Sequence, residues 1–153
     1  MHRKFISILT AVAVTMGISI HAAADTTPED AADYRTAVMD SLRGHIRAAS
    51  MSVRGLVEDR GQLVNHAQGL ANGTREFDYL FPAGSNVGDS EALPVIWEEP
   101  EDFAAAIEKV QAASAAFVAA AESGDAERIG AAFRELGGSC RGCNDKFRVA
   151  HDH

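Results

Sequence analysis

A series of apolar residues near the C-terminus, spaced alternately four and three apart, constrains the fold of this chain more than any other feature. Its members are Ile129, Phe133, Leu136, Cys140, Cys143, Phe147 and Ala150. This spacing places the side chains on one face of an α-helix, and an apolar face of this length is buried against other helices. We therefore predict a helix over residues 125–150, capped by Asp125, with both cysteines turned inward and Phe133 in the core.

Three further segments show a helical spacing of apolar residues, and we predict helices near 28–52, 60–79 and 101–122. The first begins at Thr27-Pro28, a favourable pair for a helix N-terminus, and its apolar stripe is Tyr34, Val38, Leu42, Ile46, Ala49 and Val53. A loop rich in Gly, Pro, Ser and Asp follows the second helix and extends to Trp97. The sequence shows no convincing strand pattern. It therefore predicts an all-α fold, an antiparallel four-helix bundle.

The first residues have the pattern of a secretory signal. Arg3 and Lys4 precede an uncharged apolar run over 5–20, and Ala22 and Ala24 occupy the small positions of a cleavage site. A membrane anchor is the alternative, but the run is at the short end of the roughly 18 residues that a span needs. We predict a signal peptide over 1–24 and one domain over 25–153 with no membrane span. In a bacterium, such a protein is periplasmic.

Charge and motifs restrict the function. The net charge is −8, and removal of the signal would make it more negative. An acidic surface argues against nucleic acid as a partner. The sequence has no nucleophile–base pair or paired-carboxylate motif, so we expect that the protein is not an enzyme.

The two cysteines lie three residues apart, and a histidine in place of Asn144 would complete C-x-x-C-H, the attachment motif of c-type haem. On a helix, Cys140 and Cys143 project from neighbouring turns of one face, which suits two thioether bonds to one porphyrin edge. Buried cysteines are also common as small core residues. A thiol oxidoreductase would place the pair at a helix N-terminus after a strand, whereas this pair lies in the middle of a predicted helix in a chain without predicted strands, which argues against that class of protein. A zinc site needs about four ligands, and only His151 and His153 lie near the cysteines in sequence, which argues against a zinc site.

Three glycines lie within the last predicted helix, where each costs roughly 1 kcal/mol relative to alanine. They are Gly137, Gly138 and Gly142. Either a flat ligand pressed against the helix or close packing against another helix would explain them.

Four segments together resemble the cytochrome c′ family. "AAFRELGGSCRGCNDKFR" is similar to its haem-attachment helix and "YRTAVMDSLRGHI" to its first helix, while "LFPAGS" and "ALPVIW" are similar to the segments that flank its long loop. The resemblance covers essentially the whole chain after the signal. It implies a four-helix bundle with one haem c per chain, attached covalently through Cys140 and Cys143.

The same resemblance implies roles for other residues. Arg35 and Thr36 match residues that line the haem near its propionates, and Met39 matches the apolar residue that covers the open distal face. Arg148 matches the arginine four residues after the axial ligand, where it would neutralise a propionate or contact the proximal side. Proteins of this family bind nitric oxide or carbon monoxide, transfer electrons to redox partner proteins, and commonly form homodimers through the first two helices.

Asn144 occupies the position of the axial histidine, and this is where the chain departs from the family. An imidazole nitrogen is a good neutral donor to haem iron, whereas an asparagine amide is a poor one. Two alternatives to ordinary haem binding therefore remain. One is a haem that is attached but ligated unusually, for example by the thioether of Met39. The other is a haem-free relative with a binding or structural role.

Overall fold

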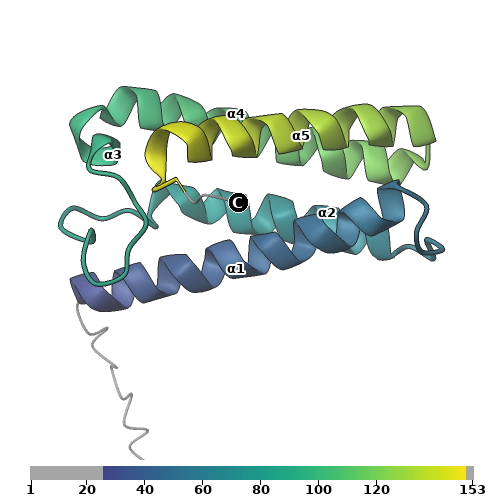
Figure 1. The fold of residues 1–153 in the computed structure, drawn as a ribbon. Helices are drawn as coiled ribbons and strands as arrows, with labels where there is room; N and C mark the ends of the chain where they lie inside the picture. The colour runs from purple at the N-terminus through teal and green to yellow at the C-terminus, as the bar shows by residue number, and fades with distance from the viewer. Residues whose placement is uncertain (1–25, 151–153) are drawn as a thin grey trace, which may run out of the picture.

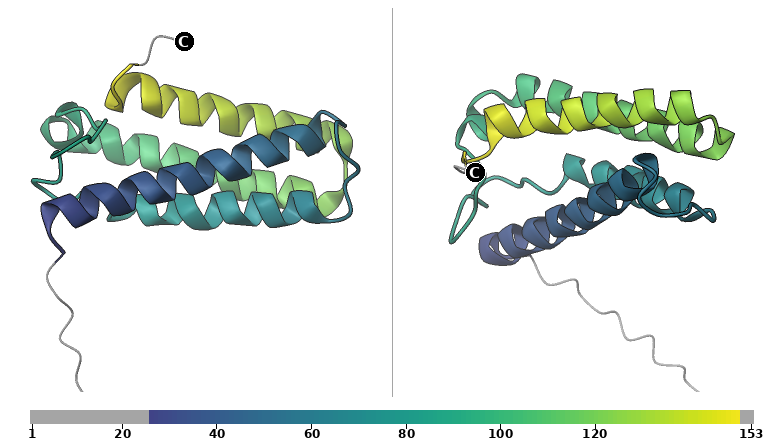
Figure 2. Two further views of the ribbon diagram at one scale, coloured as in Figure 1. Left: turned by 60° about the horizontal axis from the view of Figure 1, so that its bottom comes forward. Right: turned by 45° about the vertical axis from the view of Figure 1, so that its right-hand side comes forward.

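The structure is a computed structural model that describes residues 26–150. Its helices are α1 (Pro28–Val53), α2 (Gln62–Arg75), the 3₁₀ helix η1 (Glu76–Asp78), α3 (Val95–Glu98), α4 (Pro100–Ser123) and α5 (Ala126–Phe147). The four long helices form an antiparallel bundle in two layers, α1 with α2 and α4 with α5 (Figures 1 and 2). Since the described residues form no β-strand, the predicted all-α fold is confirmed. The predicted signal peptide lies outside the described residues.

Local sequence sets the ends of the long helices. The Thr27 hydroxyl accepts a hydrogen bond from the Asp30 N–H at 3.1 Å, and Pro28 occupies the first turn of α1. Asp125 accepts from two N–H groups of the first turn of α5, both at 3.0 Å. Gly124 ends α4 with φ 67°, a left-handed conformation that favours glycine. Both predicted N-caps are therefore confirmed.

Two apolar clusters form the core, one toward each end of the bundle. The cluster near the long loop includes Val38, Phe77, Leu80, Ile96, Phe103, Ile107, Val110 and Phe147. The cluster at the other end includes Ala49, Leu63, Ala67, Leu70, Ala113, Phe117, Ala121 and Leu136. Cys140 is half-buried and packs against both clusters, whereas Cys143 packs against the first. Cys140 thus lies at the junction of the two clusters, and Cys143 lies beside the first.

The apolar stripe of α5 is buried to different extents. Leu136 and Phe147 are buried, as predicted. Phe133 is half-buried, and its ring centroid lies 5.4 Å from that of Phe117. Phe133 therefore packs against the core from its edge, so the cost of truncating it is lower than for a central residue.

The burial of one helical turn in α1 differs from the prediction. Tyr34, placed in the apolar stripe by its spacing, is 54% exposed, and its hydroxyl donates to the Glu76 carboxylate at 2.5 Å. Arg35, one position later, is only 5% exposed. The arginine enters the interior because the long loop supplies hydrogen-bond acceptors there, which spacing alone does not reveal.

The C-terminal end of α5 comes earlier than predicted. The helix ends at Phe147 rather than at residue 150, and Ala150 is exposed. The Phe147 carbonyl accepts a hydrogen bond from the Leu93 N–H at 2.9 Å, and Arg148 forms an isolated antiparallel bridge with Ala92. The chain thus leaves the helix because the long loop binds it. The same loop contains α3, a short helix that the sequence did not predict.

Helix α4 is long and apolar enough to cross a membrane, with a mean hydropathy of 1.3 over its most apolar window. A core helix passes the same test, and the residues of α4 at Phe103, Ile107, Val110 and Phe117 are buried in the bundle. The large apolar residues of α4 thus pack in the core, and 39% of that window is buried inside the bundle.

The glycines of α5 fit neither expected explanation. Gly137, Gly138 and Gly142 are exposed, and a Cβ added at any of them would meet open space. Close helix packing therefore does not require glycine at these positions in the described chain, and none of the three lines the cavity described below.

Candidate functional site

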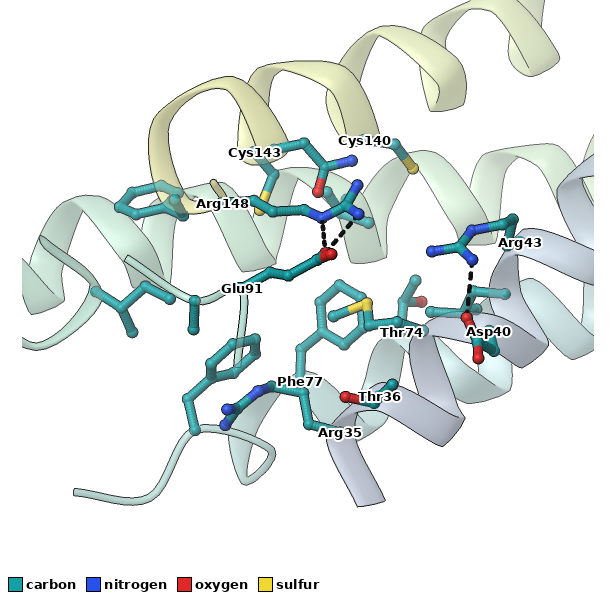
Figure 3. A pocket seen from close by; sticks show the side chains of 18 of the residues that line it. Arg35, Thr36, Asp40, Arg43, Thr74, Phe77, Glu91, Cys140, Cys143 and Arg148 are labelled. Carbon is teal, nitrogen blue, oxygen red and sulfur yellow. Dashed lines mark hydrogen bonds and ion pairs between the residues drawn. The ribbon is translucent and has the colours of Figure 1, made fainter. Parts of the chain in front are cut away.

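A cavity of about 450 Å³ lies between α1, α5 and the long loop. Figure 3 shows side chains from these elements pointing into it. Its walls are largely apolar, formed by Phe77, Phe81, Ile96, Phe103, Val110, Leu136 and Phe147. Every site residue predicted from the sequence lines it, namely Arg35, Thr36, Met39, Cys140, Cys143, Asn144 and Arg148. Segments more than 100 residues apart in the chain therefore meet at one site, as the resemblance implied.

The two cysteines carry free, half-buried thiols. Burial raises the pKa of the Cys140 thiol. Burial, with a smaller contribution from Cys140, raises the pKa of Cys143 to about 11. Both groups are consequently protonated thiols at neutral pH, which is the opposite of the lowered thiol pKa that disulfide oxidoreductases use. The raised pKa values therefore argue against a redox dithiol at this site.

The guanidinium of Arg35 organises the long loop at one end of the cavity. Nη1 donates to the Leu80 carbonyl at 3.1 Å and to Ser85 Oγ at 2.9 Å. Nη2 donates to the Ser85 carbonyl and to Ser90 Oγ, both at 2.8 Å. The guanidinium carbon also lies 5.0 Å from the ring centroid of Phe81. All four acceptors are neutral, and burial lowers the pKa of Arg35.

Arg148 and Glu91 form an ion pair at the edge of the cavity (Figure 3). Nε and Nη2 of Arg148 lie 2.6 and 2.5 Å from Glu91 Oε2. The Val149 N–H also donates to the Glu91 carbonyl at 2.8 Å. Arg148 is thus a partly buried, paired residue, and Glu91 is a site residue that the sequence analysis missed. The available signal was its position beside "ALPVIW", a segment already matched to the family.

The remaining predicted residues come from both sides of the cavity. Met39 is half-buried on α1, whereas Asn144 is exposed on α5. Thr36 is exposed and donates to the Ala32 carbonyl at 3.1 Å. The Asn144 backbone carbonyl accepts a hydrogen bond from Arg148 N–H at 3.1 Å, which completes the last turn of α5. Met39 and Asn144 are therefore both placed to face a group bound between α1 and α5.

No histidine lines the cavity within residues 26–150. His45 and His66 contact each other between α1 and α2, and neither lines the cavity. His151 and His153 lie outside the described residues. The described part of the chain therefore brings no imidazole to the position where the family places its axial ligand.

The residues present fit the attachment of haem c but not its ligation by histidine. Two thiols on neighbouring turns face one apolar cavity, and the buried Arg35 has no carboxylate among its hydrogen-bond partners. An anionic propionate would compensate this cation, because a buried charge without a counter-charge is unfavourable. At the ligand position, Asn144 offers only an amide.

The sequence matches the family model described as Cytochrome C' over residues 30–148. It is 31% identical to cytochrome c′ of Pararhodospirillum photometricum over 123 residues, which cover 80% of this chain and 98% of that protein. It is 30% identical to cytochrome c′ of Rhodospirillum rubrum over 147 residues, covering 95% and 99% of the two chains. A cytochrome c-554 of Cereibacter sphaeroides is 47% identical over 72 residues, which cover 45% of this chain and 53% of that protein.

Solved structures agree in fold. The nitric oxide complex of a cytochrome c prime mutant from Alcaligenes xylosoxidans superposes with a TM-score of 0.75 at 28% identity, covering 81% of this chain and 98% of that one. Cytochrome c′ from Rubrivivax gelatinosus superposes with a TM-score of 0.74 at 30% identity, covering 79% and 96%. Sequence, fold and the cysteine-lined cavity thus agree, and the chain belongs to the cytochrome c′ family, whose cofactor is haem c.

Proposed function

We propose that this protein is a periplasmic haem c protein of the cytochrome c′ type that binds a diatomic gas, nitric oxide or carbon monoxide, and transfers electrons. One observation carries the proposal: Cys140 and Cys143 face the same apolar cavity as Arg35, a buried cation whose hydrogen-bond partners are all neutral. This combination matches a flat apolar group with two attachment points and an anionic edge.

The chain's own residues would each serve a separate purpose. Cys140 and Cys143 would hold the haem by thioether bonds, and Arg35 would offer its positive charge to a propionate. The Arg148–Glu91 pair closes one edge of the cavity, where it would limit access of water. Met39 would cover the face opposite α5. When bound, haem c supplies an iron that takes a small ligand and exchanges one electron.

Two solved structures of one relative support gas binding. Structures of cytochrome c prime variants from Alcaligenes xylosoxidans are described with bound nitric oxide and with bound carbon monoxide. The aromatic wall of the present cavity, with Phe81 and Phe103 in edge-to-face contact at 4.8 Å between centroids, provides the dry surroundings that a small apolar ligand favours. Asn144 would leave the iron without an imidazole, so we expect weaker axial ligation than in a protein with C-x-x-C-H.

Export, oligomeric state and mode of action are parts of the same proposal. The signal-like segment over 1–24 supports a periplasmic location. A homodimer through the first two helices is part of the proposal because proteins of this family commonly form one. We propose that the protein acts by binding and electron exchange with redox partner proteins and not as an enzyme.

The second candidate is a haem-free bundle with a binding or structural role. It is favoured by Asn144, because haem-attachment systems commonly read the whole C-x-x-C-H motif. An absorption spectrum and haem staining of the protein purified from its native exported compartment distinguish the two. Covalent haem in the parent, absent from Cys140→Ser/Cys143→Ser, supports haem binding. A colourless and unstained parent with a helical far-UV spectrum supports the haem-free bundle.

Replacement of Asn144 by histidine tests whether the cavity still accepts an axially ligated haem. In a host with haem-attachment machinery, we expect Asn144→His to carry more covalent haem than the parent, or to show a high-spin spectrum typical of histidine ligation. Asp145→His is the matched control, because residue 145 is exposed and does not line the cavity. A folded Asn144→His variant without stain or colour would show that the cavity itself no longer binds haem.

A further inference from the structure

The two histidines between α1 and α2 form a close pair that the haem site does not use. His45 Nδ1 and His66 Nδ1 lie 3.1 Å apart, and their ring centroids are 5.4 Å apart with an interplanar angle of 58°. Both side chains are half-buried, and neither lines the cavity. The pair is thus a second cluster of chemically active side chains, separate from the cysteine site.

The backbone of α2 is adapted to this pair. A Cβ added to Gly69 would lie 2.5 Å from both Cε1 and Nε2 of the His45 ring. Any side chain at this position would therefore displace the ring from α2. Gly69 lowers the helix propensity of α2, and its lack of a side chain leaves room for the His45 ring to lie against α2 with Nδ1 directed at His66.

The separation of the two nitrogens corresponds to shared coordination of one ion. With metal–nitrogen bonds of 2.0–2.1 Å, two imidazole nitrogens lie about 3.3 Å apart at the tetrahedral angle of Zn²⁺ and about 2.9 Å apart at the right angle of square-planar Cu²⁺ or Ni²⁺. We propose that His45 and His66 bind a divalent transition-metal ion of borderline softness, Cu²⁺, Ni²⁺ or Zn²⁺, through their Nδ1 atoms. Imidazole suits these ions, whereas Mg²⁺ and Ca²⁺ prefer oxygen ligands.

Coordination requires a defined proton arrangement. In the metal-free pair of neutral rings, one Nδ1 carries a proton and donates it to the other. When the ion binds, that proton moves to Nε2 by exchange with water, so that both Nδ1 lone pairs face the metal. Within the described residues no third His, Cys, Asp or Glu joins the pair to form a larger ligand group. Water completes the coordination at this half-exposed site, and the ion links α1 to α2.

Isothermal titration of the purified chain with ZnCl₂, NiCl₂ and CuCl₂ at pH 7.5 tests the proposal. We expect one ion per chain at this site, with Cu²⁺ bound most tightly, as the general order of divalent metal affinities requires. His45→Gln and His66→Gln should each weaken binding about tenfold or more, since each leaves one imidazole. MgCl₂ should give no heat of binding.

Matched controls separate this site from the other histidines of the chain. His151 and His153, together with His2 and His21 where the signal-like segment is retained, are the same in parent and variants, so their contribution cancels. Asn65→Ala changes an exposed neighbour of His66 on α2 and should bind as the parent does. Far-UV circular dichroism verifies that each variant folds.

A second measurement on the unchanged parent keeps the test independent of variant folding. Two-dimensional ¹H–¹⁵N spectra of the imidazoles should show Zn²⁺ shifting both Nδ1 resonances, with Nε2 protonated in each ring. Unchanged Nδ1 resonances, or equal affinity in parent, His45→Gln and His66→Gln, would overturn the metal site and leave only a hydrogen-bonded pair. Because the pair does not line the cavity, this result is independent of whether haem is attached.

Discussion

Replacing Arg35 by methionine should destabilise the protein strongly, because this side chain holds the long loop to α1. The substitution keeps an apolar stem of similar length but removes four hydrogen bonds, to Leu80, to Ser90 and twice to Ser85. Ser85 is 0% exposed, so its carbonyl and hydroxyl would lose their partner without access to water. Each buried group that loses its hydrogen-bond partner lowers the free energy of unfolding by about 1–3 kcal/mol, whereas removing a buried cation that has no carboxylate partner recovers part of that loss. We expect a net loss of about 3 kcal/mol.

Urea denaturation followed by circular dichroism measures this loss. With a slope of about 2 kcal/mol per molar urea, the midpoint should fall by about 1.5 M. Arg43→Met is the matched control, because Arg43 pairs with Asp40 at the surface of the same helix with 65% of its side chain exposed. Such an exposed pair contributes about 0–1 kcal/mol, so its midpoint should move little.

Arg35→Lys adds a second comparison. Lysine keeps the charge but cannot reproduce the two-pronged contact with the loop, so it should recover only a minor part of the lost stability. Equal urea midpoints for Arg35→Met and Arg43→Met would refute the conclusion that Arg35 holds the long loop to α1. The comparison is made between proteins with the same haem content, since a bound cofactor adds its own stabilisation.

Three further predictions follow from burial. Phe133→Ala should cost about 3 kcal/mol in urea denaturation, the lower end of the range of about 3–5 kcal/mol for a phenylalanine, because its ring meets Phe117 from the edge of the core. A cost of about 5 kcal/mol, the upper end of that range, would mean a fully enclosed ring. Gly138→Ala should raise the free energy of unfolding by about 0.5–1 kcal/mol, because the added methyl meets open space, and a loss would indicate that another molecule covers this face. In haem-free protein, alkylation of Cys143 by iodoacetamide should be slow at pH 7 and accelerate toward pH 11. Burial raises the pKa of Cys143 in the folded state, so the protonated thiol favours folding. This contribution to the free energy of unfolding is complete below about pH 9 and is lost as the pH rises through about 11. Urea denaturation at pH 8 and at pH 10.5 would detect the loss.

Sequence spacing predicted the long helices because their signals are local. The alternation of three and four in α5, the caps at Thr27 and Asp125, and the loop before α4 all act within a few residues. The C-x-x-C spacing likewise places both cysteines on one face of a helix, and the resemblance of four segments to the cytochrome c′ family implied that they attach haem. Backbone periodicity and motif were therefore sufficient for the fold class and for the family resemblance.

Contacts between segments far apart in the chain determine the burial of side chains in α1 and the end of α5, which local sequence patterns do not predict. Spacing placed Tyr34 in the core, yet Arg35 is buried, because acceptors 45 to 55 residues away surround its guanidinium. The last turn predicted for α5 is absent because the loop around Glu91 pairs with the chain at Arg148.

The histidine pair shows the same division between local and tertiary information. His45 and His66 lie 21 residues apart and have no shared motif, so only the packing of α1 on α2 reveals that their nitrogens meet. The sequence determined which faces are apolar and which residues begin each helix. The tertiary structure alone decided which polar side chains are buried, because a buried polar group is stable only where distant segments supply its partners.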